Sequence, residues 1–186
     1  MRSPFELLRR LIVDTWIWYA KGGVALARSK GVTVGEGCRI YIRAFGTEPF
    51  LVTIGDRVTI TSGVRLITHD GSTWLVRDAD GRRYQRYAGV TVGDDVFIGV
   101  DSIVMPGVTI GSRVVIGAGS VVTADCVGGS VYAGNPARRI GDFDRFDAKI
   151  RGTCVNDREI EGIADYQTRV HEAIRLAGEK TRTPET

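Results

Sequence analysis

The sequence predicts a coil of short parallel strands built from six-residue units, and three observations support this fold class. An aliphatic residue falls at every sixth position in three blocks of the chain, glycine follows many of these residues, and the phase of the repeat breaks at two places. A period of six fits neither an α-helix, which repeats about every 3.6 residues, nor an isolated strand, which repeats about every two. It fits a chain that makes a short strand, turns a corner and repeats, so that three units close one triangular turn.

The aliphatic series defines the extent of the coil. Each member is expected to point into a narrow interior, where a polar group would lack a hydrogen-bonding partner. Small or β-branched residues recur four positions later, and glycine permits the backbone angles that a corner requires. The sequence therefore predicts a coil domain over residues 31–140. The series consists of Val34, Ile40, Ile54, Ile60, Leu66, Val92, Ile98, Val104, Ile110, Ile116 and Val122.

The two phase breaks mark segments that interrupt the coil. The spacing from Ile40 to Ile54 is two residues longer than two repeats, and that from Leu66 to Val92 is two residues longer than four repeats. The second segment, a protruding loop over residues 69–89, is rich in aromatic and cationic side chains. Such a loop on a rigid scaffold is more often functional than structural. We expect it to bind substrate, with contacts from Trp74, Arg77 and Tyr84.

An N-terminal helix is expected over residues 1–30. Phe5, Leu8, Ile12, Trp16 and Tyr19 recur at spacings of three and four, which indicates an amphipathic helix. The apolar run is too short to cross a bilayer, and charged residues within and after it disfavour a cleaved signal peptide. Two roles remain open: packing on the body of the protein, which we favour, and peripheral contact with a membrane surface, which tryptophan and flanking arginine would suit.

A C-terminal helical extension is expected over residues 141–180, followed by a disordered tail over residues 181–186. A helix over residues 157–180 would place its apolar side chains on one stripe, packed on the coil or on a neighbouring subunit. The members of that stripe are Ile160, Ile163, Val170, Ile174 and Ala177.

Composition excludes several classes of function. The formal net charge is +3, and the arginines are dispersed, so nothing in the chain calls for a nucleic-acid partner. Cys38, Cys126 and Cys154 are far apart and form no Cys-x-x-Cys pair, which disfavours a disulfide framework and a structural zinc site. This usage favours a reducing, cytoplasmic compartment.

His69 is the strongest candidate for catalysis. It stands in the run Leu-Ile-Thr-His-Asp-Gly over residues 66–71, where the repeat gives way to the loop. An imidazole titrates near neutrality, so it can accept a proton from an attacking hydroxyl and release it to a leaving thiolate. A lone histidine is ordinarily structural, but its position at the start of the loop favours catalysis. Asp70 either orients the imidazole or serves the turn, and a neighbouring subunit is an alternative source of the orienting group.

The repeats and the His69 segment resemble the hexapeptide-repeat acyltransferases. The segment around His69 resembles that of maltose and galactoside O-acetyltransferases and of capsular-polysaccharide O-acetyltransferases. The run Thr-His-Asp-Gly-Ser-Thr-Trp over residues 68–74 is most similar to the polysaccharide-modifying branch. The resemblance implies an all-β, left-handed parallel β-helix, against the usual right-handed crossover preference. It also implies His69 as general base and a homotrimer with active sites between subunits.

By resemblance, further residues are expected to bind acetyl-CoA, the acyl donor. The resemblance implies no metal. Phe97 stands where many relatives have tryptophan beside the pantetheine arm, and the backbone N–H of Val100 matches a donor that faces the thioester carbonyl. Arg138 belongs to a run similar to the family's closing motif, where its fork of donors would suit phosphate. The segment over residues 117–125 resembles the stretch that lines the coenzyme groove. It implies contacts from Ala118, Ser120, Thr123 and Ala124, the last where relatives often have lysine.

Taken together, these observations predict an acetyl-CoA-dependent O-acetyltransferase that modifies a hydroxyl of a sugar or polysaccharide precursor. An N-acetyltransferase acting on an amino sugar or a xenobiotic remains open, as does a non-catalytic β-solenoid scaffold. A γ-class carbonic anhydrase shares the coil but needs three histidine ligands for zinc, and this chain has only His69 and His171.

Overall fold

The structure is a computed structural model that describes residues 4–182. It divides into two compact units, with the boundary between Ile140 and Gly141. The first unit holds a long helix and the coil, and the second holds two further helices. Each unit is described separately below.

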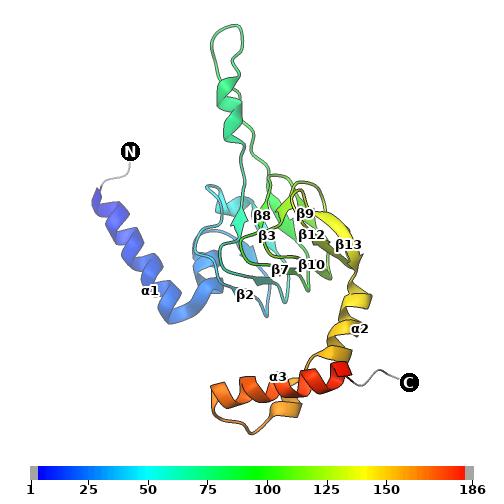
Figure 1. Cartoon of the computed structure of the whole chain (residues 1–186). Coiled ribbons are helices and arrows are strands. Elements are labelled where there is room, and N and C mark those ends of the chain that lie inside the picture. Colours follow the sequence, from blue (N-terminus) through cyan, green and yellow to red (C-terminus); the bar gives the residue numbers. More distant parts are fainter. Residues whose placement is uncertain (1–3, 183–186) are drawn as a thin grey trace. The chain divides into compact units, whose positions relative to one another are not determined.

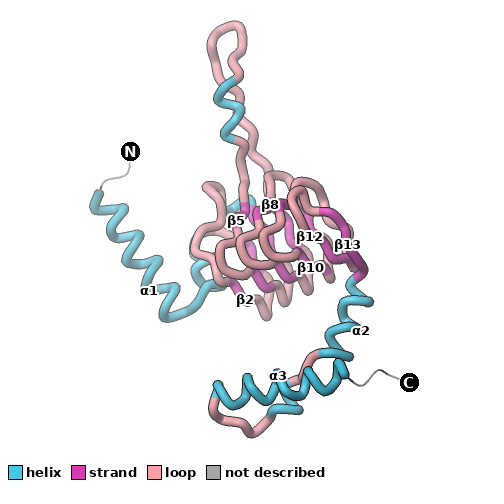
Figure 2. The backbone as a smooth tube through the Cα atoms, viewed as in Figure 1, coloured by secondary structure: helices cyan, strands magenta, loops and turns pink. Residues whose placement is uncertain are grey.

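The coil is built from short strands that form three sheets, seen as stacked turns in Figure 2. The first sheet has the order β1-β3-β6-β9, the second β13-β12-β10-β7-β4-β2 and the third β11-β8-β5. Strands of successive turns pair in parallel, as β3 does with β1 and β6. The strands are β1 (Thr33–Val34), β2 (Arg39–Ile40), β3 (Val52–Ile54), β4 (Thr59–Ile60), β5 (Arg65–Leu66), β6 (Val90–Val92), β7 (Phe97–Ile98), β8 (Ile103–Val104), β9 (Thr109–Ile110), β10 (Val114–Ile116), β11 (Val121–Val122), β12 (Ser130–Ala133) and β13 (Arg138–Asp142).

The aliphatic series occupies the interior of the coil, as the period predicts. Every member of the series is at most 9% exposed, and most are 2% or less. Most residues four positions later are also buried, and the exceptions are Cys38, Ala44 and Asp70, which lie at or next to the phase breaks or in the first turn. The buried members include Ser102 and Ser120, whose hydroxyls both donate to the carbonyl of Gly117. These hydrogen bonds remove the cost of placing two hydroxyls inside an apolar prism.

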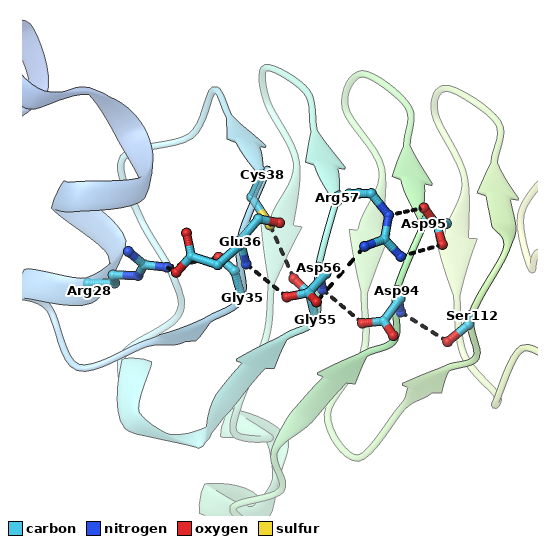
Figure 3. Close-up of polar contacts among 10 residues, drawn as sticks. All are labelled: Arg28, Gly35, Glu36, Cys38, Gly55, Asp56, Arg57, Asp94, Asp95 and Ser112. Carbon is cyan, nitrogen blue, oxygen red and sulfur yellow. Dashed lines mark hydrogen bonds and ion pairs between the residues drawn. The ribbon is translucent and has the colours of Figure 1, made fainter.

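The corner that follows the first sheet is held by a ladder of side chains, which we call the corner ladder (Figure 3). An oxygen of Asp56 accepts from the backbone N–H of Glu36 at 2.8 Å, Asp94 accepts from Asp56 at 2.8 Å, and Ser112 accepts from Asp94 at 3.0 Å. At the open end, the Arg28 guanidinium donates to the carbonyls of Val34 and Gly35. The ladder therefore satisfies backbone donors that the parallel strands leave unpaired at the corner.

The second phase break forms an antiparallel hairpin over residues 69–88 that projects from the coil (Figure 1). His69 pairs with Tyr87 at its base and Arg77 pairs with Arg83 near its tip, with a short 3₁₀ helix, η2 (Gly71–Leu75), between them. Hydrogen bonds from Asp70 N to Arg86 O and from Ala88 N to Thr68 O join the two strands of the hairpin. Strands β3 and β6 pair directly, so the coil resumes in register after the excursion.

Helix α1 (Pro4–Ser29) is broken at Gly22, whose φ of 83° and ψ of 178° are not helical. After the break, Leu26 and Ala27 are buried against the first turn of the coil. Before the break, most apolar side chains are exposed, from 45% at Val13 to 79% at Tyr19, whereas Ile17 and Trp18 are half-buried. The favoured expectation that this helix packs on the body is confirmed after Gly22. Before Gly22 it holds only for the side that carries Asp14 and Trp18, which contact Lys30 and Arg43, while the opposite apolar face is exposed. Within residues 4–182, no helix is both long and apolar enough to span a membrane.

The second unit contains α2 (Phe143–Thr153), the 3₁₀ helix η3 (Asp157–Ile160) and α3 (Tyr166–Arg182). The single helix expected over residues 157–180 is wrong, because Asn156 caps η3 with a capping box and Gly162, at a φ of 84°, turns the chain before α3 begins. Only the later part of the expected apolar stripe lies on α3. Residues 181 and 182 are helical, which corrects the start of the expected tail; residues 183–186 lie outside the described part.

Candidate active site

His69 lies where β5 gives way to the hairpin, with its side chain 40% exposed. Its Nδ1 is 2.8 Å from the hydroxyl oxygen of Thr47 and 3.3 Å from Oε2 of Glu48. A carboxylate can only accept a hydrogen bond, so contact with Glu48 favours the tautomer that carries its proton on Nδ1. Nε2 then keeps its lone pair and is the nitrogen available for proton transfer.

Glu48 and Thr47 come from the first phase break, one turn of coil before His69. Phe45, only 1% exposed, anchors this segment in the interior, where the first turn has no third strand. Gly46 follows at a φ of 73°, and a Cβ there would lie 2.7 Å from the hydroxyl oxygen of Thr68. Glycine is therefore needed for the segment to lie against the end of β5. The 3₁₀ helix η1 (Pro49–Leu51) then returns the chain to β3.

Glu48 is held as a carboxylate by its neighbours. The hydroxyl of the fully buried Thr68 donates to Oε2 at 2.6 Å. This bond, followed by the contacts with His69, lowers the pKa of Glu48 below its ordinary value of 4.5. The sequence reasoning missed Glu48 and Thr47. Residues that pair between the first two turns are 20 positions apart in the sequence, so the first phase break lies next to His69 in the stacked coil. This spacing is the signal that could have identified Glu48 and Thr47.

Asp70 contributes to the turn instead. Its Oδ1 accepts from the backbone N–H of Ser72 at 3.0 Å and from the hydroxyl of that residue at 2.6 Å. These bonds, and the more distant Arg86, lower the pKa of the Asp70 carboxyl. Of the two roles left open for Asp70, the structure gives it the N-cap of η2, and Glu48 takes the contact with the imidazole.

Two clefts meet at His69. One, of about 380 Å³, runs beside β5 and the first break and is lined by Ala44, Gly46, Thr47, residues 64–68 and His69. The other, of about 200 Å³, lies within the base of the hairpin and is lined by His69, Asp70, Gly71, Thr73, Trp74 and residues 83–87. An imidazole at such a junction can face two bound molecules at once, which a group transfer between them requires.

The hairpin candidates lie together. The Trp74 ring has the Arg77 guanidinium at 4.9 Å and the Arg83 guanidinium at 4.6 Å from its centroid. Tyr84 shares the hairpin cleft with Trp74, whereas Arg77 does not line that cleft. The Tyr87 ring lies 6.2 Å from the imidazole of His69. The cleft wall thus combines aromatic faces with cationic donors, a combination suited to polar rings such as sugars.

The residues assigned to the acyl donor form a separate group. Val100 and Ala118 lie at one corner in successive turns, where the N–H of Gly119 donates to the Val100 carbonyl. Phe97 and Val100 are 41% and 45% exposed, and Ala118, Thr123, Ala124 and Arg138 are also exposed. Ser120 is fully buried, so its side chain serves the coil and the expected contact with coenzyme is wrong for that side chain. None of these residues lines either cleft at His69 in the described chain.

The fold and the repeat define a class of protein, and comparison with known proteins gives the same class. Residues 89–124 match the family model described as the hexapeptide repeat of succinyl-transferase. Protein CapG of Staphylococcus aureus is 45% identical over 129 residues, which cover 66% of this chain and 73% of CapG. The chain belongs to the hexapeptide-repeat acyltransferases.

Two solved structures share the fold. A hexapeptide-repeat acetyltransferase from Vibrio cholerae superposes with a TM-score of 0.56 at 22% identity, over 76% of this chain and 94% of that one. AntD, an N-acyltransferase from Bacillus cereus, superposes with a TM-score of 0.51 at 20% identity, over 65% of this chain and 77% of that one. With the family model and the CapG relative, the expected family is confirmed, and the chain is an acyltransferase.

Proposed function

We propose that this acyltransferase moves an acetyl group from acetyl-CoA to a hydroxyl of a sugar or polysaccharide precursor, with His69 as general base. The observation that carries the proposal is the contact of Nδ1 with Glu48 and Thr47, which leaves Nε2 for chemistry beside two clefts. A coenzyme A thioester as donor is supported by the V. cholerae enzyme, which has also been solved with acetyl coenzyme A.

The reaction would proceed in one transfer within a ternary complex. The acceptor hydroxyl attacks the thioester carbonyl as its proton passes to Nε2 of His69. The C–O bond forms, the C–S bond breaks, and the imidazolium returns the proton to the leaving thiolate. The Glu48 carboxylate stabilises the imidazolium during the transfer. The backbone N–H of Val100 would donate to the oxyanion.

We further propose a left-handed coil and a homotrimer whose subunits complete one another's sites. The donor candidates Phe97, Val100 and Arg138 line neither cleft at His69, so a second copy is the natural source of them. The acceptor would then lie on the hairpin, against Trp74 and Tyr84.

The direct test compares His69→Ala with His171→Ala, because these are the two histidines of the chain and His171 lies on α3 in the second unit. Release of free coenzyme A from acetyl-CoA would be followed against a panel of nucleotide sugars and oligosaccharides. We expect His69→Ala to lose about 10²- to 10⁴-fold in kcat, with His171→Ala unchanged. Full activity of His69→Ala would remove His69 as the base, and an acetamide product would reassign the acceptor to an amine.

The shared site is tested by mixing two inactive variants. His69→Ala and Arg138→Ala would be unfolded together and refolded as mixed oligomers. If each site takes His69 from one chain and Arg138 from the next, random mixing restores about a quarter of the sites. No recovery in mixtures shown to contain both variants would place the two residues in the same subunit.

A further inference from the structure

The part of α1 that precedes Gly22 carries an apolar surface with no cover in the described chain. Leu8, Leu11, Ile12, Trp16 and Tyr19 are 56–79% exposed. Their spacings of three and four place them on one face of the helix. Leu11, Ile12, Trp16 and Tyr19, with Thr15 and Ala20, line an apolar concavity of about 670 Å³. Exposed apolar surface of this extent usually marks an interaction site.

The break at Gly22 separates this surface from the part of the helix that the coil holds. After Gly22, a Cβ at Gly23 would collide with the carbonyl oxygen of Ile40, and Arg28 donates to the carbonyl of Val34. Lys30 forms an ion pair with Asp14 at 2.6 Å, which links the two parts and neutralises the acid. The helix is thus attached to the coil at one end while its apolar face stays open.

Cationic side chains lie beside this face, and the acids of residues 4–21 are Glu6, which is exposed, and Asp14, which pairs with Lys30. Arg9 is exposed, the Lys21 ammonium lies 5.2 Å from the Trp16 ring centroid, and the Arg43 guanidinium lies 5.3 Å from that of Tyr19. Tryptophan and tyrosine bordered by lysine and arginine suit the boundary between lipid headgroups and acyl chains.

We propose that residues 4–21 of α1 form a membrane-surface helix that binds bilayers containing anionic lipids. The apolar face enters the boundary between headgroups and acyl chains, and Arg9, Lys21 and Arg43 contact the anionic headgroups. The helix lies in the plane of the surface, in agreement with the finding that no described helix is long and apolar enough to span a membrane. This inference is independent of the acyl acceptor and of the role of His69.

The test is flotation of the full-length protein with vesicles of phosphatidylcholine and phosphatidylglycerol in equal parts, compared with phosphatidylcholine alone. Leu11→Glu is the test variant, and Leu75→Glu is its matched control, because Leu75 is 85% exposed on the hairpin. We expect wild type and Leu75→Glu to float with the anionic vesicles and Leu11→Glu to lose at least about tenfold in partition coefficient. High salt should weaken the binding of wild type.

Three results would overturn the proposal. Two of them are absence of wild type from the anionic vesicle fraction and equal flotation of Leu11→Glu and wild type. The other is a smaller oligomer for Leu11→Glu than for Leu75→Glu by light scattering, with no vesicle binding by either variant. That result would mean that a second copy of the chain covers the apolar face. Circular dichroism of both variants checks that the coil is intact.

Discussion

The corner ladder and the edge that carries His69 belong to the same coil, yet the repeat treats them differently. At the ladder, the same contact recurs from turn to turn, with Asp56, Asp94 and Ser112 each receiving a backbone N–H. At the edge of β5, the first two turns both depart from the repeat, through the Glu48 segment and through the hairpin. The regular corner builds the scaffold, and the irregular edge brings Glu48 to His69.

The difference teaches how a repeat protein can carry a site without loss of register. The partners at the corner ladder are 18 residues apart where no insertion intervenes and 38 apart across the hairpin, yet the hydrogen bond is the same. Insertions therefore leave the coil and return to it with the stacking unchanged. Because each turn contacts only its neighbours, the stability of the coil depends on the contacts between turns, and disruption of the ladder should lower it. Changes at the irregular edge should mainly affect activity.

The largest expected effect on stability comes from Gly55→Ala at the ladder. A Cβ at Gly55 would collide with Oδ1 of Asp94 and lie 2.8 Å from the carbonyl carbon of Gly93, so the backbone would have to move. We expect a loss of about 2–3 kcal/mol in the free energy of unfolding. Urea unfolding followed by far-ultraviolet circular dichroism measures it.

The control for that substitution is Gly71→Ala. Gly71 opens η2 in the hairpin, and a Cβ there meets nothing within 4 Å. Its free energy of unfolding should change by less than about 0.5 kcal/mol. Equal losses at the two glycines would mean that close stacking at the ladder is not what requires Gly55.

The same comparison explains what could be predicted from the sequence. The interior was predictable because each aliphatic position, such as Ile60 or Ile98, faces the same environment in every turn, so its signal repeats. His69 was predictable as a candidate because it stands at the point where that repetition stops. The carboxylate that contacts His69 was not predictable. Adjacency in the sequence suggested Asp70, whereas stacking between turns brings Glu48 to the imidazole.

The break in α1 was less predictable for a different reason. Helical periodicity continues through Gly22 and reports which residues share a face, but not what covers that face. The backbone at Gly22 ends the first helical part, and only Leu26 and Ala27 beyond it are buried.

The irregular edge at β5 is tested at Glu48, which we regard as a positioning residue for His69. Glu48→Gln keeps the shape of the side chain but removes the charge that favours a proton on Nδ1. We expect kcat to fall about ten- to a hundredfold with little change in KM, by analogy with other groups that orient a histidine. Glu36→Gln is the control, because Glu36 is an exposed carboxylate at the corner ladder. Equal kcat values for the two variants would leave Glu48 without a role in positioning.

Glu48 should also give the smallest of these effects, a dependence of stability on pH. Its pKa is lower in the folded protein than its ordinary value of 4.5, chiefly because Thr68 donates to the carboxylate. The folded state therefore binds this proton less readily than the unfolded state, so the stabilisation is complete above about pH 4.5 and disappears as the pH falls through the lower, folded pKa. Melting temperatures of wild type and Glu48→Gln, measured from about pH 6 down to about pH 3, should differ by a constant amount at the upper end and converge at the lower end. A difference that persists unchanged to the lowest pH would show that Glu48 stabilises the fold through packing and not through its charge.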